Sequence, residues 1–147
     1  MRKFRNSLQF AIEGLKKVHQ NQRNFRIQTY FGLFALLLAF FLDLTGQQLL
    51  WISFAVMIVL IMESINTIIE TLLDFLHPEY NEIVGLIKDI SAAVVLIAAV
   101  FAVVIGCIIF GEAIFNLNPK YGIIIAIIFI IFIKAFSFKG GSDDESN

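Results

Sequence analysis

The sequence predicts an all-α fold, a polytopic membrane helical bundle with an N-terminal amphipathic surface helix, three core spans and an extra C-terminal span. Of the 147 residues, 59% are hydrophobic, and the mean hydropathy of +0.83 is far above that of soluble domains. The hydrophobic residues gather in four long stretches without the period-two alternation of strands. Because a bilayer offers no hydrogen-bond partner for exposed backbone groups, we expect each stretch to be a helix.

The first element is an amphipathic helix, expected at about residues 3–20. Seven of the eleven basic residues lie in the first 26 positions, mostly away from the apolar face of this helix. We expect the helix to lie in the membrane interface, where anionic lipid attracts Lys and Arg. The alternative is a soluble helix packed on a partner. Spacings of three and four residues place five apolar side chains on one face: Phe4, Leu8, Ala11, Leu15 and Val18.

Three core spans are expected to follow, at about residues 27–44, 49–74 and 90–112. A span needs about 20 residues, and the first two are short as purely apolar runs. Their polar flanks, including Gln28 and Thr29, can lie among lipid headgroups. A fourth apolar stretch at residues 115–138 predicts an additional peripheral span. Residues 139–147 are rich in Gly, Ser and acids, and we expect them to be disordered.

The distribution of basic residues predicts the orientation of the bundle. The N-terminus, Lys88, Lys134 and Lys139 fall on one side of the membrane, and Lys120 alone falls on the other. The positive-inside rule therefore places both termini and the connection at residues 75–89 in the cytoplasm. We expect a multi-pass protein of the cell (inner) membrane.

The second span carries a set of residues that we call the polar stripe: Glu63, Asn66, Glu70 and Asp74. Their spacing places them within about 80° of arc on one helix face. An intramembrane carboxylate costs about 2.5 to 3.5 kcal/mol, so several on one face require a cation, a partner or a water-filled site. The alternative, that the acids only reach the headgroup layer, applies best to Asp74, less well to Glu70 and least to Glu63. The stripe therefore predicts a functional site.

Lys88 and Asp89 stand where the third span begins. A Lys there could meet phosphate and an Asp could hold a cation, although an ordinary interfacial pair is the alternative. Carboxylate and amide oxygens beside a Lys suit Mg²⁺ and phosphate. The sequence contains no Walker-type GxxxxGK[ST] motif and no protein-kinase HRD or DFG set. A phosphotransferase site would therefore have to be built differently.

Several separated motifs carry a resemblance to a known family. They are RNFR at residues 23–26, ESINTIIE at residues 63–70, PEY at residues 78–80 and KD at residues 88–89. In this order and at these distances they resemble the small bacterial integral membrane diacylglycerol kinase and undecaprenol kinase family, across about residues 4–110. The resemblance implies that residues 1–114 form a membrane lipid kinase domain. Such a domain transfers the γ-phosphoryl group of ATP to a lipid alcohol at the cytoplasmic interface.

The resemblance also implies roles for individual residues. Glu63 would be the catalytic base and would contact the lipid substrate, together with Arg26. Glu70 would bind Mg²⁺, with Zn²⁺ as an alternative ion. The implied partners are ATP, a lipid alcohol, the bilayer and further copies of the chain in a homotrimer with shared active sites, and no nucleic acid. Nucleotide binding would involve a larger set: Lys3, Asn66, Glu70, Glu79, Tyr80, Lys88 and Asp89.

Three features depart from the family pattern. Gln22 stands where the family usually has a metal-binding Glu, so this ligand would bring an amide oxygen without charge. Lys3 stands for an Arg and lacks its bidentate grip on phosphate. The span at residues 115–138 lies outside the three-span pattern. Gln22 motivates the rival hypothesis, a non-catalytic structural or regulatory membrane protein on the same scaffold.

The identity of the lipid alcohol stays open between undecaprenol and diacylglycerol. The wording NTIIE and RNFRI favours undecaprenol. A channel or proton-coupled transporter is disfavoured, because its polar groups would be distributed through the bilayer depth, whereas these acids gather at one end.

Overall fold

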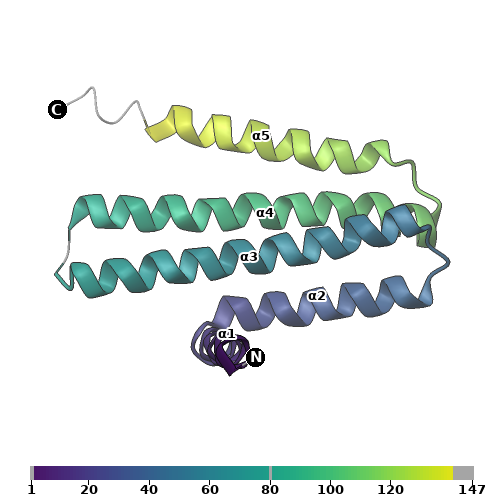
Figure 1. Cartoon of the computed structure of the whole chain (residues 1–147). Helices are drawn as coiled ribbons and strands as arrows, with labels where there is room; N and C mark the ends of the chain where they lie inside the picture. Colours follow the sequence, from purple (N-terminus) through teal and green to yellow (C-terminus); the bar gives the residue numbers. More distant parts are fainter. Residues whose placement is uncertain (1, 80, 141–147) are drawn as a thin grey trace.

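The structure, a computed structural model, describes residues 2–79 and 81–140 and folds them into five helices (Figure 1). Helices α2 to α5 lie beside one another in chain order and alternate in direction, and α1 crosses them near the start of α2. The predicted all-α membrane bundle is confirmed. The helices are α1 (Arg2–Asn21), α2 (Arg23–Phe41), α3 (Gly46–Leu76), α4 (Glu82–Phe115) and α5 (Lys120–Gly140).

Three of the described helices, α2, α3 and α4, are long and apolar enough to cross a membrane. Helix α3 has 31 residues and α4 has 34, which makes them about 46 and 51 Å long. The hydrocarbon core is about 30 Å thick, so both helices must extend beyond it. Helix α5 coincides with the fourth apolar stretch, and its crossing of the membrane stays a prediction. Residues 139 and 140 of the predicted tail belong to α5, and the rest of the tail lies outside the described residues.

Local signals fix the ends of the two long helices. Thr45 and Gln48 form a capping box at the start of α3. Asn81 caps α4, because its side-chain oxygen accepts hydrogen bonds from the backbone N–H groups of Ile83 at 2.9 Å and Val84 at 3.3 Å. At the other end of α4, Asn116 adopts the left-handed conformation, with φ 53°. The cap at Asn81 starts α4 about two turns before residue 90, where the third span was expected to begin.

Helix α3 lies at the centre of the bundle, between α2 and α4 (Figure 1). A Cβ added to Gly32 on α2 would lie 2.6 Å from Cγ1 of Val56 on α3, and one added to Gly122 on α5 would lie 2.3 Å from Cγ1 of Ile108 on α4. Glycine therefore permits close helix approach at both places. Many large apolar side chains face outward, including Phe40 at 79% exposure, as in helices that contact lipid.

Candidate active site

The buried polar side chains of the described residues gather in one region of the bundle. Three lie on α3 and the fourth on α4, and each is at most 8% exposed: Glu63, Asn66, Thr67 and Ser91. The first two belong to the polar stripe, whose remaining members, Glu70 and Asp74, are half-buried and exposed. Burial of a polar group is costly unless it is hydrogen-bonded, so the partners of these side chains define the site.

Glu63 is 3% exposed and its carboxylate is held from α2. Nε2 of Gln28 donates a hydrogen bond to its Oε2 at 3.0 Å. Within the described residues, the other carboxylate oxygen, Oε1, accepts no hydrogen bond and the carboxylate has no Lys or Arg partner. One oxygen is therefore fixed in direction, and the other remains open to a hydrogen-bond donor.

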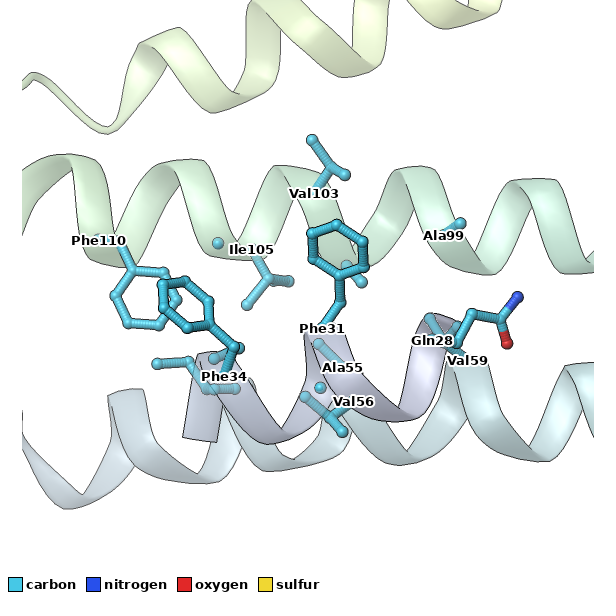
Figure 2. Close-up of a pocket in the computed structure, with 15 residues that line it drawn as sticks. Gln28, Phe31, Phe34, Ala55, Val56, Val59, Ala99, Val103, Ile105 and Phe110 are labelled. Carbon is cyan, nitrogen blue, oxygen red and sulfur yellow. The ribbon is translucent and has the colours of Figure 1, made fainter. Parts of the chain in front are cut away.

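Gln28 differs from its expected place among lipid headgroups. It is half-buried, and its amide lies at the polar end of a groove between helices (Figure 2). The close approach of α2 and α3 at Gly32, one turn further along α2, brings the amide to α3. Sequence reasoning missed this role because the signal, a polar residue at the start of an apolar run, is shared by ordinary interfacial residues.

Asn66 links the stripe to α4. Its Nδ2 donates to Oε1 of Glu70 at 3.0 Å, and its Oδ1 accepts a hydrogen bond from Oγ of Ser91. Oγ of Ser91 also lies 2.9 Å from the backbone oxygen of Lys88. Ser91 was missed by sequence reasoning, although its position three residues after Lys88 puts both on one side of a helix. These bonds fix the amide of Asn66 and turn one oxygen of Glu70 toward it.

Lys88 forms an ion pair with Asp74 across the neighbouring ends of α3 and α4. The partner of Lys88 is therefore the last residue of the polar stripe. Their side chains are 33% and 67% exposed, so solvent screens the pair and its contribution to stability is small. The ammonium group lies near the Asn66–Glu70 pair through the Ser91 contact.

Other predicted site residues are not joined to Glu63 or Glu70 by hydrogen bonds in the described chain. Arg26 donates to the backbone oxygens of His19 at 3.2 Å and Gln20 at 2.7 Å, and so caps the end of α1. Gln22 is the N-cap residue of α2, and its side chain makes no capping hydrogen bond. Tyr80 lies outside the described residues. The remaining ones are exposed: Lys3, Glu79 and Asp89.

The oxygen ligands of the site fit a metal ion that arrives with its phosphates. Among residues 2–79 and 81–140, no group of three or more His, Cys, Asp or Glu is placed to hold a metal. Glu70 offers one carboxylate beside the amide of Asn66. Mg²⁺ is commonly held by one or two carboxylates while substrate phosphates and water complete its shell. The donor set therefore suits Mg²⁺ carried by a nucleotide better than a resident ion.

An apolar groove of about 410 Å³ lies between α2, α3 and α4. Gln28 contributes the polar side chain among the residues that line it, and its amide lies at the end opposite to Phe34 and Phe110 (Figure 2). The rest of the lining consists of apolar side chains and glycines. The groove is therefore suited to a hydrocarbon chain whose polar end lies toward Gln28 and, through it, toward Glu63.

Comparisons with known proteins point to one family. The family model described as prokaryotic diacylglycerol kinase matches residues 9–110. The diacylglycerol kinase of Escherichia coli (strain K12) is 34% identical over 100 residues, which cover 68% of this chain and 82% of that protein. The diacylglycerol kinase of Haemophilus influenzae is 31% identical over 106 residues, or 71% of this chain and 90% of that protein. The family match contains the polar stripe and ends before α5.

Proposed function

This chain belongs to the prokaryotic diacylglycerol kinase family, and we propose that it transfers the γ-phosphoryl group of ATP to the hydroxyl of a lipid alcohol at the membrane interface. The family match confirms the lipid kinase resemblance of the sequence, and the chain is a multi-pass membrane protein. The observation that carries the proposal is the carboxylate of Glu63, which is 3% exposed and keeps one oxygen open.

Glu63 acts as the general base in this proposal. The lipid hydroxyl gives its proton to Oε1 of Glu63, and its oxygen attacks the γ-phosphorus of ATP. The bond from that phosphorus to the bridging oxygen breaks, and ADP leaves with the electron pair. Gln28 keeps the carboxylate in position through its hydrogen bond to Oε2. Phosphoryl transfer requires mainly positioning and neutralisation of charge, with a base beside the attacking oxygen.

Glu70 and Asn66 would hold the Mg²⁺ that accompanies ATP, with Zn²⁺ as a possible substitute. The ion would neutralise charge on the phosphates. The ammonium of Lys88 is placed to do the same from α4, once it exchanges Asp74 for a phosphate oxygen. Nucleotide contacts of Lys3, Glu79, Tyr80 and Asp89, and a lipid contact of Arg26, rest on the family resemblance alone.

Gln22 provides a direct test of the metal assignment. If Gln22 contributes to the metal site, Gln22→Glu adds a charged ligand and should lower the Mg²⁺ concentration required for half-maximal transfer. We expect a decrease of about tenfold, the usual scale for a change in a metal ligand's surroundings. Titration of Mg²⁺ in the transfer assay measures this. The same titration curve in Gln22→Glu and wild type would refute the placement of Gln22.

A homotrimer with shared active sites is part of the proposal. It is supported by the spacing of the predicted site residues, since Gln22 and Asp89 are not joined to Glu70 within one chain. A second copy could supply them. The proposed location is the cell (inner) membrane with the N-terminus and the active site in the cytoplasm, supported by the basic residues of α1.

The lipid acceptor is tested by assay. The relatives are named for diacylglycerol, while the motif wording favours undecaprenol. Purified protein in bilayers, given ATP labelled in the γ-phosphate and Mg²⁺ or Zn²⁺, should form a labelled lipid from at least one of the two alcohols. Absence of labelled lipid from both would contradict the proposal and favour the non-catalytic alternative.

A further inference from the structure

Gln28 carries a buried hydrogen-bond acceptor next to the proposed base. Its Nε2 donates to Glu63, but its Oε1 is buried without a hydrogen-bond partner among the described residues. The amide cannot be reversed to remove this deficit, because its oxygen would then face the carboxylate oxygen of Glu63 and both are acceptors. A buried acceptor without a donor is costly, so a ligand that supplies a donor is favoured here.

The position of this oxygen indicates which ligand would meet it. Gln28 lies at the polar end of the apolar groove, with Val59 of α3 beside it (Figure 2). A lipid that places its chain in the groove and its reacting hydroxyl at Glu63 brings the neighbouring atoms of its headgroup to Gln28. The reacting hydroxyl has one hydrogen, which goes to Glu63, so it cannot also satisfy Gln28.

We propose that Gln28 is a specificity-determining residue whose Oε1 accepts a hydrogen bond from a second donor on the lipid alcohol, adjacent to the reacting hydroxyl. This inference rests on the proposed kinase function. The favoured acceptors are lipid alcohols with a free hydroxyl or an amide N–H beside the phosphorylated carbon. Lipids with a single hydroxyl leave Oε1 to a water molecule. A site that hydrogen-bonds a substrate hydroxyl discriminates strongly against the analogue that lacks it.

A matched pair of lipids isolates this one hydrogen bond. Monoacylglycerol has a free central hydroxyl, and the monoester of propanediol with the same acyl chain lacks only that group. For the full-length wild type in bilayers, we expect kcat/KM with monoacylglycerol to exceed that with the propanediol ester by about tenfold or more. Gln28→Met removes the amide at similar length and should bring this ratio close to one. The control Gln47→Met removes an exposed amide at the start of α3 and should keep the wild-type ratio.

Binding gives a second readout that does not depend on turnover. Monoacylglycerol should raise the thermal unfolding midpoint of the wild type more than the propanediol ester does, and the two lipids should act equally on Gln28→Met. Equal kcat/KM for both lipids in the wild type, or an unchanged ratio in Gln28→Met, would overturn the role of Gln28 while leaving the kinase function intact. Failure to phosphorylate any of the lipid alcohols would overturn both proposals.

Discussion

Glu63 shows how a carboxylate can be kept inside a membrane helix. It is 3% exposed, and its recorded side-chain partner is the neutral amide of Gln28 rather than a cation. A buried charge of this kind is retained where it serves a function, because its insertion is costly. The next residues of the stripe each have a partner at increasing exposure, from Asn66 to Asp74. Charge thus becomes more solvated toward the end of α3.

Lys88 separates a phosphate contact from a structural ion pair. Lys88→Met should raise the KM for ATP by about tenfold, because a charge-assisted hydrogen bond to phosphate is lost. Its thermal unfolding midpoint should change little, since the pair with Asp74 is partly exposed. Asp74→Asn removes the same pair and serves as the control, with an unchanged or lower KM for ATP. A similar rise of KM in both variants would show that the pair itself is required.

The sequence was sufficient to predict the polar stripe but not its partners. The spacing from Glu63 to Asp74 depends only on helix geometry, which is regular. Gln28 and Ser91 approach the stripe from other helices, and their contacts depend on where α2 and α4 pack. Single-sequence patterns do not encode these crossing positions. Likewise, the pairing of Lys88 with Asp74 became visible only when both helix ends were in place.

At the level of elements, the contact between α2 and α3 positions the proposed base. A Cβ on Gly32 would lie 2.6 Å from Cγ1 of Val56, so the two helices approach closely one turn away from Gln28. The start of α4 was misplaced by sequence reasoning because its first two turns include polar residues after Asn81. Helix α5 lies against α4 through Gly122, outside the family match.

Gly32→Ala tests whether this approach matters for activity. The added methyl group should separate α2 from α3, destabilise the protein by about 1–3 kcal/mol and reduce transfer, because Gln28 moves away from Glu63. Val56→Ala in the same chain should restore both properties, since it removes the opposing methyl groups. Gly14→Ala is the control, because a Cβ there meets nothing within 4 Å. Loss of activity in Gly32→Ala without rescue by Val56→Ala would contradict this explanation.

The whole molecule has a polar end and an apolar end. The crossing helix α1, the end of α3 and the start of α4 lie together, while the connection between α2 and α3 lies at the opposite end (Figure 1). The charge distribution predicted this arrangement, since basic residues cluster in α1. The packing order of the helices could not be predicted, because their apolar surfaces carry little directional information.

Labelling of single cysteines tests the orientation. In a Cys107→Ala background, Asp43→Cys should react with a membrane-impermeant thiol reagent on intact cells, because Asp43 is exposed at the outer connection. Ser7→Cys, exposed on α1, should react only after the membrane is permeabilised. Labelling of Ser7→Cys on intact cells would place the proposed active site on the wrong side for cytoplasmic ATP.

The most direct test of the account is phosphoryl transfer by Glu63→Gln. This change keeps the shape of the side chain and removes its ability to accept the hydroxyl proton, so we expect transfer to a lipid alcohol to fall by about 10² to 10⁴-fold. Glu112→Gln is the control, because Glu112 is exposed near the far end of α4, and it should keep wild-type activity. Wild-type transfer by a folded Glu63→Gln protein would contradict the assignment of Glu63 as the base.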